Sequence, residues 1–171
     1  MTVFRVALAV HVLAGLTSVV AGVLAATARK RPGRHPRAGL VYLSGVTVVC
    51  ATSAVMAALR WPHDAHLFAI ALVAFGLAAY GWRARRRRRP GWVVRHAIGL
   101  GGSFIAMMTG FYVDNGARLP VWKLLPHVAY WLVPAAVGIP LIWRALRRYR
   151  AGVSSRPLEG AGSAGPRRPR R

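Results

Sequence analysis

The sequence predicts an all-α membrane protein, a bundle of five transmembrane helices with its N-terminus outside and its C-terminus in the cytoplasm. The 171-residue chain is 55% hydrophobic, and its apolar residues form long blocks, which is the pattern of helices that face lipid. The basic residues, which give a formal net charge of +22, lie almost entirely between and after these blocks. The consecutive arginines at 85–89 cannot enter a bilayer, so they indicate a loop between two spans.

The apolar blocks are each long enough to cross the hydrocarbon core, and breaks of different kinds separate them. The first break contains prolines and a glycine at 32–36, and the second is a short turn around Pro62. The third is the arginine cluster, and the fourth starts at the turn signal 114–116. We therefore expect spans at about 6–27, 38–59, 65–82, 93–113 and 122–143.

The fifth predicted span contains three prolines, Pro126, Pro134 and Pro140. Prolines are tolerated in transmembrane helices because neighbouring helices and local rearrangement satisfy the freed carbonyl groups. The prolines therefore do not exclude a helix here.

The distribution of basic residues predicts the orientation of the chain. With five spans and the N-terminus outside, only four of the 25 Lys and Arg residues face the outer side, namely Arg5, Arg60, Arg118 and Lys123. Cytoplasmic loops of membrane proteins carry an excess of Lys and Arg. We therefore expect a multi-pass membrane protein whose basic loops and tail lie on the cytoplasmic side, next to anionic lipids.

The end of the chain, residues 151–171, is rich in Gly, Ser, Pro and Arg. Such a composition cannot bury apolar surface, so we expect a disordered basic tail. Nucleic acid is not an expected partner, because the basic residues share no face with aromatic residues in a soluble fold. The single cysteine, Cys50, excludes a disulfide framework and a thiolate metal site.

No catalytic motif is present in the sequence. It contains no phosphate-binding loop, no serine nucleophile elbow and no zinc-protease motif, and the predicted spans hold no carboxylate. We therefore expect a non-catalytic membrane component that packs against a membrane-protein partner or a second copy, or that binds a small lipophilic ligand.

The histidines suggest an alternative function. His11 and His127 lie near the outer ends of their predicted spans, and His35 and His96 lie near the inner ends. Ionisable residues inside spans are rare and usually face the bundle interior. One outer and one inner pair of axial imidazoles would suit a carrier of haem b, or a quinone-linked electron carrier. His66 is an alternative to His127 as the outer ligand, and no metal other than haem iron is expected.

Glycines lie close to these histidines. Gly15 is one turn from His11, and Gly99 is three residues after His96. Their small size would leave room for a flat macrocycle beside the imidazoles. The simpler interpretation of such glycines is close packing between helices.

Short motifs at 11–15, 35–42, 96–116, 125–134 and 138–141 resemble the DUF2306 family of uncharacterised bacterial membrane proteins. The likeness spans residues 8–146 and implies a multi-helix inner-membrane protein without an assigned substrate. Where that family carries His-Arg at the second motif, this chain has His-Pro-Arg.

Overall fold

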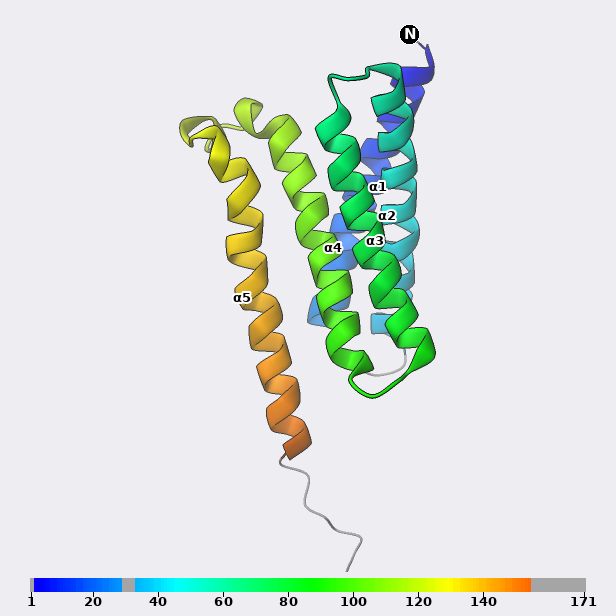
Figure 1. The fold of residues 1–171 in the computed structure, drawn as a ribbon, viewed down its shortest axis with the longest axis vertical. Coiled ribbons are helices and arrows are strands. Elements are labelled where there is room, and N and C mark those ends of the chain that lie inside the picture. Colours follow the sequence, from blue (N-terminus) through cyan, green and yellow to red (C-terminus); the bar gives the residue numbers. More distant parts are fainter. Residues whose placement is uncertain (1, 29–32, 155–171) are drawn as a thin grey trace, which may run out of the picture.

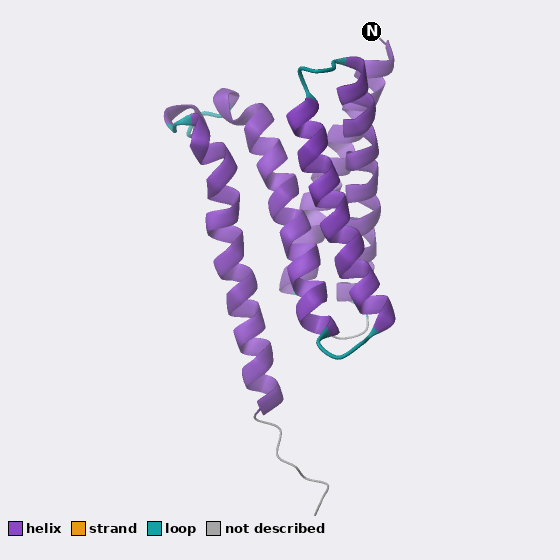
Figure 2. Cartoon of the chain, in the orientation of Figure 1, coloured by secondary structure: helices purple, strands orange, loops and turns teal. Residues whose placement is uncertain are grey.

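The computed structural model describes residues 2–28 and 33–154, and these residues form five long helices without any strand. Two short 3₁₀ turns, η1 (Gly116–Arg118) and η2 (Trp122–Leu124), join the last two helices. Figures 1 and 2 show the helices running side by side in alternating directions. They are α1 (Thr2–Thr27), α2 (Arg34–Leu59), α3 (Ala65–Arg87), α4 (Trp92–Asn115) and α5 (His127–Ser154).

Each of these helices is long and apolar enough to cross a membrane. Their large apolar side chains point mostly away from the bundle, as at Leu13, which is 67% exposed, and Val137, which is 57% exposed. An apolar surface of this extent is stable only in contact with lipid. The chain is therefore a multi-pass membrane protein with five transmembrane helices, as the sequence predicts.

The helices form two antiparallel pairs, α1 with α2 and α3 with α4, and α5 packs along α4 (Figure 1). The centre of the bundle is a small cluster formed by Ala21 of α1, Tyr42 and Val46 of α2, and Ala78 of α3. Phe104 of α4 packs against this cluster, and a Cβ atom on Gly22 would lie 2.7 Å from its ring. Small residues at these positions let the helix backbones approach closely.

The backbones of α3 and α4 approach each other closely at Gly81 and Gly99. A Cβ atom on Gly99 would lie 2.6 Å from the Cα atom of Gly81. The space that we expected beside Gly99 for a macrocycle is therefore filled by the α3 backbone. Gly15 differs, because a Cβ atom there would have no neighbour within 4 Å.

The helices extend beyond the predicted apolar spans. α2 begins at Arg34, and α3 continues through its arginines to Arg87. Arginine is a good helix former, and its long stem can lie along the helix while its head stays in water. The end of a helix therefore does not coincide with the end of an apolar block.

The fifth helix begins and ends later than the predicted span. Residues 122–124 form the turn η2, and α5 begins at His127, after Pro126. Pro134 and Pro140 do lie inside the helix, as predicted. α5 continues to Ser154, so the first residues of the predicted tail are helical, whereas 155–171 lie outside the described residues.

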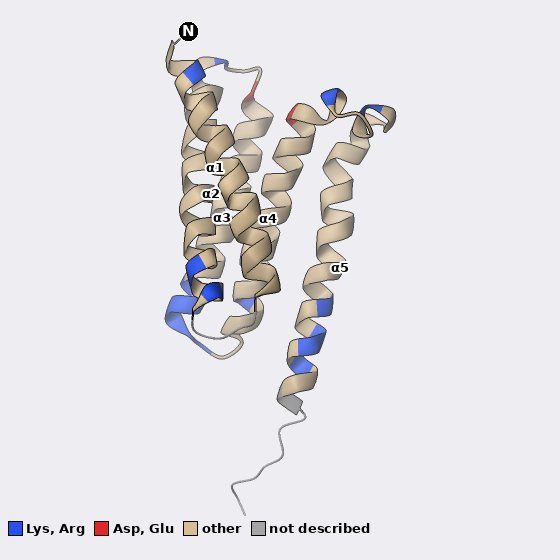
Figure 3. Ribbon diagram, turned by 180° about the vertical axis from the view of Figure 1, so that it is seen from behind, with Lys and Arg blue, Asp and Glu red and all other residues tan. Residues whose placement is uncertain are grey.

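The basic residues divide the bundle into two unlike ends (Figure 3). We call the end with the N-terminus, the 60–64 turn and the 116–126 segment the N-terminal end. The opposite end, with the start of α2 and the 88–91 loop, is the arginine-rich end. Asp64 and Asp114 both lie at the N-terminal end, where Asp64 contacts Arg60 at 3.7 Å.

Candidate functional site

At the arginine-rich end, two histidines from different helices lie together. His35 is in the first turn of α2 and His96 is in the second turn of α4. Their ring centroids are 6.4 Å apart, and the rings are nearly perpendicular, at 85°. The structure therefore brings together the two residues of the predicted inner pair.

Backbone carbonyl groups fix the orientation of both rings. His35 Nδ1 lies 2.9 Å from the carbonyl oxygen of Ala25 in α1, and His96 Nδ1 lies 3.0 Å from that of Gly81 in α3. A carbonyl oxygen only accepts hydrogen bonds, so each Nδ1 carries a hydrogen and donates it. A neutral imidazole of this kind has its lone pair on Nε2, the form that many metal-ligating histidines adopt.

A second polar pair lies deeper along the same two helices. Tyr42, which is 2% exposed, donates its hydroxyl hydrogen to Ser103 Oγ at 3.0 Å. Tyr42 follows His35 by seven residues, and Ser103 follows His96 by the same number, so each pair of residues shares one helix face. The two polar pairs are thus separated by roughly 10 Å along the bundle.

Sequence reasoning did not identify the pair formed by Tyr42 and Ser103. The equal seven-residue spacing from His35 and from His96 is the signal that could have indicated it. A buried hydroxyl in a span needs a partner, and the neighbouring helix supplies it here.

The histidines of the N-terminal end are arranged differently. His11 Nδ1 lies 3.0 Å from Thr52 Oγ1 of α2. Because the Thr52 hydroxyl donates to the carbonyl oxygen of Val48, its oxygen is the acceptor for His11. His11 is thus bonded within the α1 and α2 pair.

His127 and His66 lie on other helices. His127 is the exposed first residue of α5, with its ring centroid 5.2 Å from that of Tyr130. His66 is exposed in the first turn of α3. Within the described part of the chain, no hydrogen bond or ring contact joins His11 to either of them. The structure does not bring the predicted outer ligands together.

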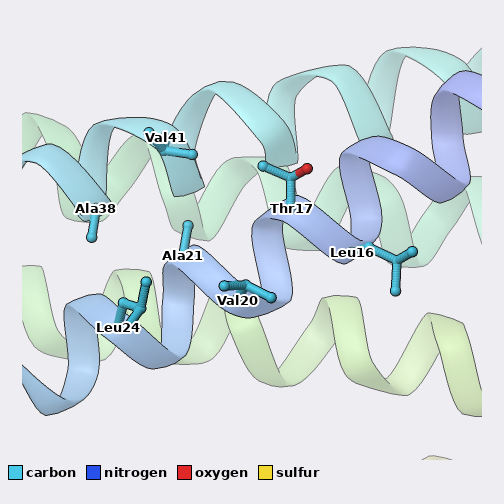
Figure 4. A pocket seen from close by; sticks show the side chains of 7 residues that line it. All are labelled: Leu16, Thr17, Val20, Ala21, Leu24, Ala38 and Val41. Carbon is cyan, nitrogen blue, oxygen red and sulfur yellow. The ribbon is translucent and has the colours of Figure 1, made fainter.

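A groove of about 430 Å³ runs between α1 and α2 (Figure 4). Its one polar side chain, Thr17, donates its hydroxyl hydrogen to the carbonyl oxygen of Leu13, so the surface that the groove offers is apolar. Small-molecule sites have volumes of about 300–1,000 Å³ and mostly apolar linings. The lining consists of Leu16, Thr17, Val20, Ala21, Leu24, Ala38 and Val41.

The donor atoms present limit the metal chemistry of the histidine pair. Among the described residues, no group of three or more His, Cys, Asp or Glu side chains could hold a metal ion. A structural zinc site takes four protein ligands and a catalytic one takes three, so these residues do not form one. If a haem were bound at this end, His35 and His96 are the residues that would hold its iron.

We compared the chain with models of protein families, with curated proteins and with solved structures, and nothing matched. The resemblance to the DUF2306 family therefore stays a prediction.

Proposed function

We propose that this chain is a non-catalytic component of the bacterial cytoplasmic membrane, and that the groove between α1 and α2 holds one acyl chain of an anionic lipid. The observation that carries this proposal is the apolar groove itself, which is open to the surrounding lipid. Leu16, Val20 and Leu24 on its α1 side are 62%, 59% and 56% exposed. An occupant that reaches the groove from the bilayer is therefore a lipophilic one.

The length of the groove suits a single acyl chain of one leaflet. Its α1 side runs from Leu16 to Leu24, which is roughly 12 Å along a helix. The hydrocarbon core of a bilayer is about 30 Å thick, so the groove covers less than one leaflet. It lies in the half of the bundle nearer the arginine-rich end, because Leu24 and Ala38 are close to the loop between the two helices.

Charge at one end of the groove favours an anionic headgroup. Arg34 and Arg37 are both exposed in the first turns of α2. Each precedes a lining residue by four positions, Ala38 and Val41 respectively, and therefore lies on the same helix face. Basic residues at the membrane surface attract anionic lipids.

Photocrosslinking tests the proposal. The protein is reconstituted with a phosphatidylglycerol that carries a photoactivatable acyl chain, and crosslinked peptides are mapped. We expect labelling concentrated at residues 16–24 and 38–41. Ala38→Phe fills the groove and should reduce the labelling several-fold, whereas Ala136→Phe, at an exposed alanine of α5, should leave it unchanged. Uniform labelling of all five helices would contradict the proposal.

The orientation has its own test. We propose that the arginine-rich end is cytoplasmic, because the positive-inside rule places Lys-rich and Arg-rich loops there. A reporter that is active only in the cytoplasm should work when fused after Arg150, and one that is active only outside should work when inserted near Gly116. The reverse result at both sites would overturn this orientation.

A second candidate function, haem-dependent electron transfer, is supported by the contact between His35 and His96. Both imidazoles are held by backbone carbonyl groups and come from different helices, as axial ligands often do. When bound, haem b would supply one-electron redox chemistry, and the two histidines would hold and orient it. The contact between Gly99 and Gly81 counts against this function, because it removes space beside His96.

Reduced-minus-oxidised spectroscopy separates the two candidates. If the second candidate is right, protein expressed with ample haem shows b-type bands that His35→Ala and His96→Ala abolish. His66→Ala, at an exposed histidine of the other end, is the matched control and should keep the bands. Wild-type protein without b-type bands would eliminate the haem function and leave the lipid proposal unaffected.

A further inference from the structure

A pocket of about 330 Å³ lies at the arginine-rich end, and its lining includes neither a histidine nor a residue of the lipid groove. It is lined by Trp82, Arg85, Arg86 and Arg88, all from the last two turns of α3 and its C-cap. Trp82 is 40% exposed, which is typical of a tryptophan at the membrane interface. The pocket therefore lies where α3 leaves the apolar part of the membrane.

Aromatic rings position two of the three guanidinium groups. The Arg86 guanidinium lies 5.0 Å from the centroid of the Trp82 ring. The Arg88 guanidinium lies 5.9 Å from the centroid of the Trp92 ring, which belongs to α4. A cation over an indole face is stabilised electrostatically, so these side chains are more ordered than freely solvated arginines.

The backbone at Arg88 is unusual. Arg88 caps α3 in the left-handed conformation, with φ of 44°, and its N–H donates to the carbonyl oxygen of Ala84. Glycine or asparagine normally occupies such a cap, because a side chain disfavours this conformation. An arginine that persists at a strained position suggests that its side chain has a role.

The chain itself has little negative charge to offer this pocket. Of its three acidic residues, Asp64 and Asp114 lie at the N-terminal end, and Glu159 lies outside the described residues. The helix dipole places about half a negative charge at the C-terminal end of α3. The positive charge of the three guanidinium groups is larger. The pocket therefore retains a net positive charge and favours an external anion.

We propose that this pocket binds the phosphate group of an anionic membrane lipid. Guanidinium groups hydrogen-bond phosphate oxygens in pairs, and basic pockets at the cytoplasmic ends of transmembrane helices suit lipid headgroups. A soluble phosphate ion could offer the same oxygen atoms to the arginines, but the apolar surface of α3 next to the pocket favours a lipid. The exposed residues Leu72, Val73 and Phe75, further along the helix, present apolar surface to the acyl chains of such a lipid.

This site is separate from the groove between α1 and α2, because the two share no residue. The arginines of the pocket would bind the headgroup of a lipid, whereas the apolar lining of the groove would contact an acyl chain. Filling the groove with Ala38→Phe should therefore leave binding at the pocket intact.

Native mass spectrometry of the full-length protein in detergent tests the proposal, with phosphatidylglycerol and phosphatidylcholine titrated separately. We expect tight binding of phosphatidylglycerol only. In the Ala38→Phe background, which fills the groove, replacing Arg85, Arg86 and Arg88 together by Gln should weaken it by about a hundredfold. The matched control replaces Arg144, Arg147 and Arg148 of α5 by Gln, which removes the same charge at the same end and should have little effect.

Arg88→Gly keeps the test informative if the triple variant fails to fold. Glycine adopts a φ of 44° without strain, so this variant should be at least as thermally stable as the wild type and still bind the lipid more weakly. Equal losses in the pocket and control variants, or unchanged binding in Arg88→Gly, would overturn the proposal. Binding of inorganic phosphate without binding of phosphatidylglycerol would overturn the lipid assignment.

Discussion

Both ends of the bundle contain histidines, but the contacts of these histidines differ. At the arginine-rich end, His35 and His96 come from helices whose faces meet, and their ring centroids are 6.4 Å apart. At the N-terminal end, His11 bonds to Thr52 on α2, while His127 begins a helix that packs along α4. Histidines at one end of the bundle therefore need not contact one another, because their side chains must also face each other across the bundle.

Close helix packing accompanies the histidine contact at the arginine-rich end. Gly81 and Gly99 bring the backbones of α3 and α4 together, and the carbonyl oxygen of Gly81 also accepts the hydrogen bond from His96. Gly15, one turn from His11, has no neighbour at the position of a Cβ atom. The glycine contact and the orientation of His96 thus depend on one another, whereas Gly15 is free of such a constraint.

The largest expected effect is that of Gly99→Leu. Its side chain would overlap the backbone of α3, and overpacking typically costs about 1–3 kcal/mol, occasionally more. The thermal unfolding midpoint of the detergent-solubilised protein should fall by several degrees. Gly15→Leu is the matched substitution near His11 and should change the midpoint little. Equal losses in both variants would contradict the difference between the two ends.

A smaller effect is expected for Tyr42→Phe, which removes the hydroxyl that donates to Ser103. Hydrogen bonds between transmembrane helices average about 0.6 kcal/mol and reach about 1.7 kcal/mol. A double-mutant cycle with Ser103→Ala, followed by equilibrium unfolding, should give a coupling free energy within that range. Thr47→Val is a suitable control, since the Thr47 hydroxyl bonds only within its own helix, to the carbonyl oxygen of Leu43. Zero coupling would show that the observed bond does not stabilise the fold.

Much of this fold can be predicted from the sequence, because the constraint of the bilayer acts on each helix separately. The length of an apolar block is enough to predict that a helix crosses the membrane, and all five spans were predicted in this way. The boundaries were less predictable, as at the end of α3, because arginine is compatible with helix beyond the apolar region.

Contacts between helices were the part that could not be predicted. Pairing His11 with His127 required α1 and α5 to be neighbours, and a loop length does not decide which helices meet. The contact between Gly81 and Gly99 likewise depends on how α3 and α4 cross. Periodic small residues indicate that a face packs, but the identity of the partner face depends on the whole bundle.

The smallest expected effect concerns His11 and His127. If the two residues have no shared partner, the changes in unfolding free energy of His11→Ala and His127→Ala should add in the double variant to within about 0.3–0.5 kcal/mol. Equilibrium unfolding of the four proteins in detergent gives this comparison. A coupling free energy well above that range would show that the two histidines do interact, and it would revive them as a pair of ligands at the N-terminal end.

The cycle of His11→Ala with Thr52→Val provides the positive control for that measurement. The Nδ1 atom of His11 and the Thr52 hydroxyl oxygen are 3.0 Å apart. Once either partner has been replaced, replacing the other should therefore lower the unfolding free energy little further. A measurable coupling in this cycle shows that the method detects one hydrogen bond between α1 and α2. Additivity of His11 and His127 under the same conditions then shows that the two residues share no contact, in contrast to His35 and His96, whose rings meet across the bundle.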